Sequence, residues 1–463
     1  MSGTRTTEII EAIQRKISSR ALVAGEKLPS IRGLARTMQV SPSTVVDAYD
    51  RLAAEGTIYA RRGSGFYVAD NRQPFTISKA GPRLEHAIDP FWVSRQSLDA
   101  DADALKPGCG WLPAEWQPLA PLRRAIRRLA RADDALLTDY GSTRGAPNLR
   151  RFLARQFADE GLPVAPDQIL LTSSGTQAID LICRLLLRAG DTVLVDDPCY
   201  FNFQALLRAH HVNIISTPFS KTGPDIERFE QALVQHKPRL YLTNSALHNP
   251  TGATISPQTA HRVLKLANTH DLTIVEDDIF SQFEPGPSPR LALLDGLDRV
   301  IRIGSFSKTL SASVRCGYIT ARPDWIEALV DLQVATNFGG PSPIAAELVY
   351  AVLNDGTYRK HMAALRNKLT RARSDTAAQL NAIGITPWLD PRGGFYLWCR
   401  LPDNADATKL ARLALNDNII LAPGNVFSVS QSMSNFMRFN VSQMQSPKIF
   451  DVIAQALKAL RAK

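Results

Sequence analysis

The chain has 463 residues, which exceeds what one compact domain usually holds and predicts about three folding units. Hydrophobic residues make up 44% and charged residues 21%, a composition that excludes a wholly disordered chain and a small disulfide-stabilised fold. The formal net charge of +10 is compatible with an anionic partner such as DNA.

The sequence predicts neither a membrane span nor a secretion signal. The most apolar stretch, 169–187, is interrupted by Asp180 and Arg184, so no run of about 18 apolar residues can cross a bilayer. The N-terminal MSGTRTTEII has no apolar core and no cleavage pattern, which predicts a cytoplasmic protein. The five cysteines are scattered without CxxC spacing, so we expect no disulfide framework and no metal site.

Residues 1–70 carry the pattern of three helices followed by a hairpin. Isoleucines recur at helical spacing between positions 9 and 17, and Ser30 can cap a second helix. Ser41, followed by Pro42, is typical of the start of a third helix, which would end near Gly56. Two short β-like runs, 57–61 and 66–68, complete the unit.

Residues 71–105 are polar and proline-containing, which predicts a linker, and residues 106–463 form the remaining part. In that part strand-like apolar runs alternate with helix-length segments; the clearest runs are 169–172, 192–195, 239–243, 272–276 and 300–303. This alternation predicts βαβ units and a mainly parallel sheet. An arginine-rich helix at 123–131 is interpreted as a solvated face, with a dimer rim or an auxiliary DNA track as alternatives.

The order of elements in 1–70 is typical of a winged helix-turn-helix. The first residues of the third helix would face base edges in the major groove, and Ser43 and Thr44 stand there. Arg32 and Arg62 would contact phosphates or a groove. The alternative is a solvated three-helix domain without a nucleic-acid partner, since two acids on the third helix oppose phosphate binding.

Residues 25–68 closely resemble the DNA-binding domain of GntR-type regulators, including the motif LPSIR and the sequence AAEG before the wing. The resemblance implies operator DNA as a partner, contacted by Arg32, Ser43, Thr44 and Arg62. Some related domains carry a basic residue where Pro42 stands, so a contact made by that residue would be absent here.

Four elements in the larger part together predict a phosphate-bearing aldehyde cofactor. The turn TSSGTQ at 172–177 follows a strand and opens a helix, so its backbone N–H groups form an anion site. Asp277 ends another strand and can hold a pyridine nitrogen protonated. Lys308 can form a Schiff base, Arg315 can clamp a phosphate, and Asn249 can bond a phenolic oxygen. Taken singly, each motif is more often a helix cap, a loop acid, a surface lysine or a turn.

The motif order SGTQ, NPTG, EDD, SFSK and a further arginine resembles the fold-type I aminotransferases over residues 106–463. The resemblance implies pyridoxal 5'-phosphate as cofactor, with Lys308 carrying the internal aldimine and Asp277 pairing with the pyridinium nitrogen. It assigns to the phosphate Gly175, Thr176, Gln177, Ser305, Ser307 and Arg315.

The same resemblance implies further roles. Tyr200 would stack on the cofactor ring, and Tyr140 would reach the phosphate of a neighbouring subunit, which implies a homodimer. Arg438 would bind a substrate carboxylate, with an ordinary surface arginine as the alternative. Family members commonly carry a tyrosine shortly after the aspartate, whereas Ile279 and Phe280 stand here. Asn249 alone is therefore expected to hold the phenolic oxygen.

A GntR-type winged helix-turn-helix joined to an aminotransferase-like body looks like the MocR subfamily of bacterial transcriptional regulators. It implies an α/β fold whose mainly parallel sheet is flanked by helices, with a smaller C-terminal α+β subdomain. Our first hypothesis is a DNA-binding regulator that senses an amino compound by transaldimination at Lys308. The alternatives are a catalytically active aminotransferase that acts on an amino acid, and a regulator that senses pyridoxal phosphate itself.

Overall fold

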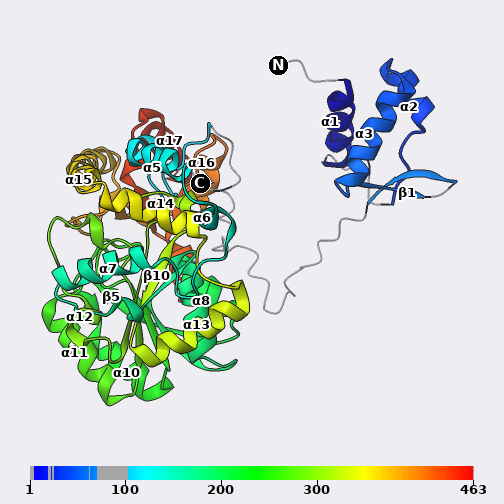
Figure 1. The fold of residues 1–463 in the computed structure, drawn as a ribbon. Helices are drawn as coiled ribbons and strands as arrows, with labels where there is room; N and C mark the ends of the chain where they lie inside the picture. The colour runs from blue at the N-terminus through cyan, green and yellow to red at the C-terminus, as the bar shows by residue number, and fades with distance from the viewer. Residues whose placement is uncertain are drawn as a thin grey trace. The chain divides into compact units, whose positions relative to one another are not determined.

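The computed structural model describes residues 5–18, 22, 25–61, 63–69, 98 and 103–461. The chain divides into two compact units, Met1–Glu85 and His86–Lys463, each with its own hydrophobic core (Figure 1). Of the predicted linker 71–105, only Leu98 and residues 103–105 are described. Leu105 already pairs with the larger unit through a parallel β-bridge to Ile419.

The N-terminal unit has the predicted order of three helices and a hairpin. Its elements are α1 (Arg5–Ser18), α2 (Ile31–Met38), α3 (Pro42–Ala54), β1 (Ile58–Arg61) and β2 (Gly65–Val68). The two predicted caps are confirmed, because the Ser30 hydroxyl accepts from the Gly33 N–H at 3.1 Å and the Ser41 hydroxyl accepts from the Thr44 N–H at 3.2 Å.

A small apolar core holds this unit together. Leu52 and Tyr49 of α3 are fully buried against α1 and α2, and the Tyr49 ring lies edge-to-face with Phe66 at a centroid distance of 4.9 Å. The Tyr49 hydroxyl donates to the Pro29 carbonyl at 2.8 Å. The helices and the hairpin therefore share one core.

The larger unit is built on an eight-stranded sheet in the order β3-β10-β9-β8-β7-β4-β5-β6. The strands are β3 (Ile169–Thr172), β4 (Thr192–Asp197), β5 (Asn213–Ser220), β6 (Gly223–Pro224), β7 (Leu240–Thr243), β8 (Thr273–Asp277), β9 (Val300–Ser305) and β10 (Gly317–Thr320). The strands β5, β4, β7, β8 and β9 run parallel, whereas β10 is antiparallel to both neighbours. All five predicted strands are present, and the prediction of a mainly parallel sheet is confirmed.

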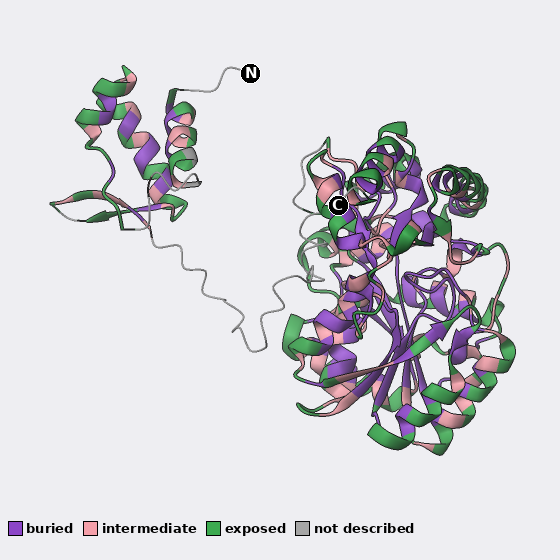
Figure 2. Ribbon diagram, turned by 180° about the vertical axis from the view of Figure 1, so that it is seen from behind, coloured by how far each residue is buried: buried purple, intermediate pink, exposed green. Residues whose placement is uncertain are grey.

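Helices cover both faces of this sheet, and the strands β3, β7, β9 and β10 are buried along their whole length (Figure 2). Successive side chains of β3 point to opposite faces of the sheet, and each face has its own hydrophobic cluster. Leu170 packs into the cluster on one face and Leu171 into the cluster on the other. The described helices of the whole larger unit are α5 (Leu119–Leu129), α6 (Asp134–Thr138), α7 (Pro147–Asp159), α8 (Gly175–Leu186), α9 (Phe201–Ala209), α10 (Ile226–His236), α11 (Pro257–Thr269), α12 (Leu291–Asp295), α13 (Pro323–Asn337), α14 (Pro343–Asn354), α15 (Thr357–Ala382), α16 (Ala407–Leu415) and α17 (Pro447–Arg461). Among the described residues, no helix has the length and apolarity that crossing a membrane requires.

A smaller C-terminal sheet completes the larger unit. Its strands are β11 (Thr386–Pro387), β12 (Tyr396–Arg400), β13 (Ala422–Pro423) and β14 (Phe436–Asn440), all antiparallel to their neighbours in the order β11-β12-β14-β13. The helices α16 and α17 pack together beside it. The predicted fold class, an α/β body with a smaller α+β subdomain, is confirmed.

Truncation of Leu52 tests the independence of the N-terminal core. We expect Leu52→Ala to lower the free energy of unfolding of this unit by about 2–5 kcal/mol, because it removes a fully buried side chain. Hydrogen exchange measures the effect as lost protection of the amides in α1, α2 and α3. Val46→Ala, at a position that is 39% exposed on the same helix, is the control and should change stability by less than about 0.5 kcal/mol. Equal loss of protection in the larger unit would contradict two separate cores.

Candidate cofactor site and DNA interface

A cavity of about 220 Å³ lies in the larger unit at the carboxyl ends of the parallel strands, where α/β sheets bind their ligands. Ten of the residues predicted for the site line it together: Gly175, Thr176, Tyr200, Asn249, Asp277, Ser305, Ser307, Lys308, Arg315 and Arg438. Two predicted residues, Gln177 and Tyr140, do not line it. The sequence motifs, although separated by up to 263 positions between Gly175 and Arg438, thus converge on one site.

One end of the cavity is suited to an anion. The N-terminus of α8 opens onto it, with Ser174 as N-cap and Gly175 and Thr176 in the first turn. The hydroxyls of Ser305 and Ser307 lie 2.9 Å apart at the same end, and Arg315 lines it without an ion-pair partner among the described residues. Backbone N–H groups, hydroxyls and a guanidinium form the donor set that binds phosphate.

Close backbone packing builds this end of the cavity. A Cβ added to Gly317 of β10 would lie 2.9 Å from the carbonyl carbon of Ser174 and 2.8 Å from the Gly304 carbonyl oxygen. Glycine at 317 is therefore required for the turn before α8 to approach β10. The position of this turn then sets the direction in which the N-terminus of α8 points.

Gln177 holds this turn from inside. Its side-chain carbonyl accepts from the Ser173 N–H at 2.6 Å, and its own N–H donates to the Ser174 hydroxyl at 3.0 Å. The side-chain oxygen and the main-chain N–H of Gln177 are thus both bonded within the turn. The predicted contact of Gln177 with the phosphate stays a prediction.

Lys308 lines the cavity, and its amine has a lowered proton affinity. Its Nζ donates to the carbonyl of Gly110 at 2.7 Å. Burial, with the nearby Arg438 guanidinium, lowers the pKa of Lys308 to about 8. A substantial fraction of the amine is therefore neutral near physiological pH, as attack on an aldehyde requires.

Asp277 supplies a buried negative charge without a cation. The residue is 8% exposed and its carboxylate accepts the Ile279 N–H at 3.2 Å, while the Asp277 main-chain carbonyl accepts from the Asn244 amide at 2.9 Å. No lysine, arginine or histidine among the described residues forms an ion pair with it. Burial accordingly raises the pKa of Asp277 to about 7. A cationic ring nitrogen in the cavity would supply the missing counter-charge.

Arg438 supplies the opposite case, a buried guanidinium without a carboxylate. The side chain is 1% exposed, donates to the Asn249 side-chain oxygen at 2.9 Å and to the Gly108 carbonyl at 2.7 Å, and lies 4.2 Å over the Tyr396 ring. Its Nε has no hydrogen-bond partner among the described residues. These contacts contradict the surface-arginine alternative and fit a site for a carboxylate.

Two features of the site had no signal in the sequence. Tyr396 of β12 lines the cavity, and its hydroxyl would lie 3.3 Å from a Cβ added to Gly110, so the two residues are close neighbours. Burial raises the pKa of Tyr396, which keeps its hydroxyl a neutral donor. Residues 108–111 also line the cavity.

The amide Nδ2 of Asn249 has no hydrogen-bond partner among the described residues and remains available for the phenolic oxygen assigned to it.

Tyr140 lies on the surface of the single chain. Its side chain is 81% exposed and packs edge-to-face on Phe338, which is itself 67% exposed, at a centroid distance of 4.9 Å. Exposed apolar residues that contact each other are typical of surfaces that bind another molecule. The predicted contact with a neighbouring subunit stays a prediction.

Two of the four predicted DNA-binding residues, Ser43 and Thr44, lie at the start of α3. The Ser41 hydroxyl lies 2.7 Å from the Ser43 hydroxyl and 2.8 Å from that of Thr44. Arg32 of α2 is exposed and has no ion pair within the described segments. Arg62 lies outside the described residues.

One of the two acids that oppose DNA binding forms an ion pair within α3. Asp47 forms an ion pair with Arg51 at 3.1 Å, one turn along α3. The hairpin that follows carries two stacked rings, Tyr59 and Tyr67, at a centroid distance of 5.8 Å. Asp47 has a cationic neighbour on its own helix, whereas Asp50 of the same helix is exposed and has no ion pair among the described residues.

A mainly parallel sheet of this order, with a lysine, an unpaired aspartate and an anion site at the strand ends, defines a pyridoxal-phosphate-dependent protein of fold type I. The model for aminotransferase class I and II matches residues 110–456, and the chain belongs to this family. The model for bacterial regulatory proteins of the gntR family matches residues 5–68, so the chain combines the two domains in the manner of MocR-type GntR regulators.

Two relatives named as transcriptional regulators match along most of the chain. The HTH-type transcriptional regulator YdcR of Escherichia coli (strain K12) is 29% identical over 98% of this chain and 99% of its own length. NorG of Staphylococcus aureus (strain USA300), also named as an HTH-type transcriptional regulator, is 26% identical over 87% of this chain and 92% of its own.

Solved structures resemble the larger unit. A kynurenine aminotransferase of Pyrococcus horikoshii has a TM-score of 0.73 and 25% identity, covering 81% of this chain and 96% of its own. The α-aminoadipate aminotransferase LysN of Thermus thermophilus, complexed with N-(5'-phosphopyridoxyl)-L-leucine, has a TM-score of 0.72 and 25% identity over 80% and 95% of the two chains. Pyridoxal phosphate is the cofactor of this family, and the unpaired Asp277, the anion site and Lys308 fit it.

The buried carboxylate gives a pH-dependent prediction for the cofactor-free protein. Because folding raises the pKa of Asp277 from 3.8 to about 7, the folded chain binds more protons, and the free energy of unfolding falls as the pH rises between these values. We expect Asp277→Asn to stabilise the cofactor-free protein at pH 8, by an amount on the order of 4 kcal/mol, and less at pH 5.

Urea denaturation at the two pH values measures this difference. Asp331→Asn, at an exposed position on α13, is the control and should leave both values unchanged. An Asp277→Asn protein that gains nothing at pH 8 would show that the carboxylate has a cationic partner in the free chain.

Proposed function

We propose that this protein is a DNA-binding transcriptional regulator whose larger unit binds pyridoxal phosphate and senses an amino compound. The observation that carries the proposal is the presence, in one chain, of a GntR-type domain and of a cavity that holds Lys308, Asp277 and Arg438 together. The names of the full-length relatives support the regulatory part. In this proposal residues 1–70 bind DNA, 71–105 link the units and 106–463 bind the cofactor.

The charges of the cavity indicate the class of ligand. When bound, pyridoxal phosphate supplies an aldehyde that an incoming amine can take over from a lysine. Lys308, with its pKa lowered to about 8, can attach to and release that carbonyl carbon. Arg438 is placed to bind a carboxylate, so an α-amino acid or a similar amino compound fits the cavity.

Release of Lys308 provides the signal in this proposal. The freed ammonium group carries a charge in a buried cavity next to Arg438, which alters the electrostatic balance of the site. Such a change shifts the protein between two conformations only if the ligand binds them with different affinity. The regulator is therefore expected to hold two arrangements of its larger unit that differ in ligand affinity.

On DNA, Ser43 and Thr44 would lie at the major groove, with Arg32 and Arg62 at the backbone or an adjacent groove. The exposed hydroxyls at the start of α3 and the unpaired Arg32 support this arrangement. Two winged helices in a dimer would read two half-sites of an operator.

A homodimer is the assembly that the exposed apolar residues support. Tyr140 and Phe338 form a contacting aromatic pair, and Ile344, 40% exposed, follows in the same segment. Pro343 of that segment lies close to Gly141, beside Tyr140. A second copy that covers this patch would also bring Tyr140 toward the other cavity, as the family resemblance implies.

An active aminotransferase is the second candidate function. The lowered pKa of Lys308 favours it, because a neutral amine beside the reacting atoms can accept the α-proton of a substrate. The regulator and the enzyme differ in whether turnover occurs and in whether the ligand changes DNA binding.

Replacement of Lys308 tests the proposal directly. Borohydride reduction with pyridoxal phosphate should fix the cofactor to the tryptic peptide that contains Lys308, and Lys308→Ala should lose this label. Lys308→Ala should keep its DNA footprint but lose the response of that footprint to amino compounds. Lys360→Ala, an exposed lysine on α15, is the control and should behave as the wild type.

A panel of amino acids separates the two candidate functions in the yellow holoprotein. A spectral change without keto-acid release, together with a ligand-sensitive footprint, is the result expected for a regulator. Steady keto-acid release without any operator footprint would overturn the regulatory proposal in favour of the enzyme.

The dimer gives a separate prediction. Phe338→Asp should raise the dissociation constant of the dimer by at least about 30-fold, because it places a charge in an apolar contact. Analytical ultracentrifugation measures the change. Val234→Asp, on α10 at a side chain that is 59% exposed, is the matched control and should leave the dimer intact. Dissociation to the same extent in both variants would contradict the assigned patch.

A further inference from the structure

Three consecutive acids end β8, and their side chains point to different surroundings. Asp277 lines the cofactor cavity, whereas Glu276 and Asp278 bond groups on the other side of the strand end. Glu276 is fully buried and accepts the N–H groups of Leu291 and Ala292, both at 2.8 Å, and the Ser245 hydroxyl. Glu276 is therefore satisfied by neutral donors.

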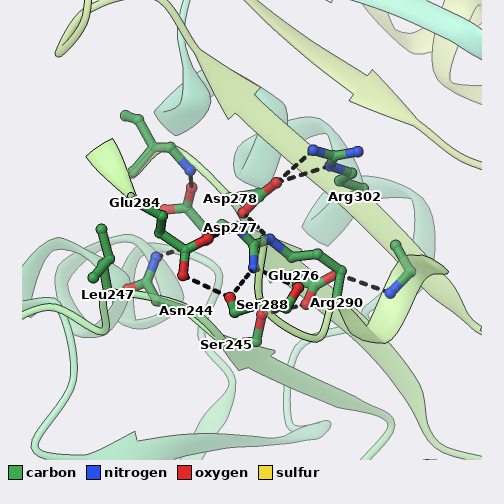
Figure 3. A network of polar contacts seen from close by, with 12 residues as sticks. Asn244, Ser245, Leu247, Glu276, Asp277, Asp278, Glu284, Ser288, Arg290 and Arg302 are labelled. Carbon is green, nitrogen blue, oxygen red and sulfur yellow. Dashed lines mark hydrogen bonds and ion pairs between the residues drawn. The ribbon is translucent and has the colours of Figure 1, made fainter. Parts of the chain in front are cut away.

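Asp278 is instead clamped between two buried guanidinium groups (Figure 3). Arg302 of β9 donates to one carboxylate oxygen of Asp278 through Nε at 3.0 Å and Nη2 at 2.6 Å. Arg290 donates to the other oxygen through Nε at 2.6 Å. The exposed fractions of Asp278 and Arg302 are both 3%, so this clamp is shielded from water.

Each guanidinium is itself fixed from behind. Arg302 also pairs with Glu160 at 2.8 Å and lies 4.5 Å over the Phe157 ring. Arg290 pairs with Glu284 at 2.6 Å, and the Ser288 hydroxyl donates to the same carboxylate at 2.6 Å. The clamp on Asp278 therefore has a rigid support on both sides.

The backbone next to Asp278 connects its ion pairs to the side chain of Asp277. The N–H of Asp278 donates to the Ile303 carbonyl at 2.9 Å, and the next N–H, that of Ile279, is the group that orients the Asp277 carboxylate. A displacement of Asp278 would move this N–H and free the Asp277 side chain to turn away from the cavity. Removal of the clamp would also leave the charge of Asp278 uncompensated beside that of Asp277.

We propose that Arg302 is a positioning residue of the cofactor site, which holds Asp277 toward the cofactor ring by clamping Asp278. The inference rests on the proposed pairing of Asp277 with the ring nitrogen. It assigns to the buried ion network a role in cofactor affinity in addition to its role in the stability of the fold.

A double-mutant cycle on cofactor affinity tests this assignment. The probes are pyridoxal 5'-phosphate and pyridoxine 5'-phosphate, which lacks the aldehyde and so reports ring and phosphate binding without Lys308. We expect Arg302→Met to weaken binding of both by about tenfold. In an Asp277→Asn background the same change should have less than about a twofold effect, because its route to the ring is already removed.

Arg302→Lys is the conservative variant, and it also serves if Arg302→Met does not fold. It keeps the charge but not the two-pronged contact, so its cofactor affinity should lie between the affinities of the wild type and of Arg302→Met. In the Asp277→Asn background, Arg302→Lys should have no further effect on affinity. Arg299→Met is the matched control, because Arg299 precedes the same strand and pairs at 2.7 Å with an exposed acid, Asp271. Its cofactor affinity should equal that of the wild type.

The outcomes separate the inference from the function on which it rests. Equal losses of affinity in both backgrounds, or none in Arg302→Met, would overturn the positioning role while leaving cofactor binding intact. A wild-type chain that binds neither probe, or an Asp277→Asn change without effect on binding, would instead overturn the proposed pairing of Asp277 itself.

Discussion

The structure depends on burying opposite charges that are not paired with each other. Asp277 and Arg438 face the same cavity, yet the carboxylate has no cation and the guanidinium has no carboxylate among the described residues. Leaving buried charges uncompensated costs folding free energy, which raises the pKa of Asp277 and lowers that of Lys308. A ligand with a cationic ring, and a second with a carboxylate, would remove this cost, which is why the proposed function assigns both to the cavity.

The surrounding fold maintains this unfavourable arrangement. Asp277 is carried by β8, Lys308 follows β9, and Arg438 comes from the smaller sheet on β14. Charges that repel or lack partners stay in place only where rigid elements hold them. The ion network behind β8 provides this rigidity at Asp278, whose carboxylate is paired with Arg290 and Arg302. The paired carboxylate of Asp278, on one side of the end of β8, therefore supports the unpaired carboxylate of Asp277 on the other side.

Local signals in the sequence were sufficient for much of this architecture. Ser30 and Ser41 were predicted as helix caps because an N-cap needs only a hydroxyl three residues before an N–H. Buried parallel strands such as Ile169–Thr172 were predicted from continuous apolar runs. The motif resemblance then supplied Lys308, Asp277 and Arg438, which the structure brings to one cavity. The edge strands β6, β11 and β13 are two residues long and leave no periodicity to detect.

Contacts between segments that are distant in the sequence could not be predicted from such local signals. Tyr396 and Gly110 both line the site although they lie far apart in the sequence. Only the folded chain brings the Gly110 carbonyl oxygen within 2.7 Å of the Lys308 Nζ. The clamp of Arg302 on Asp278 likewise joins neighbouring strands whose charges look unremarkable in sequence. An arginine in a buried strand is nonetheless informative, because a guanidinium remains charged and must find an acid there. In this chain that acid adjoins Asp277, so the need to neutralise one buried charge also fixes the direction of the next.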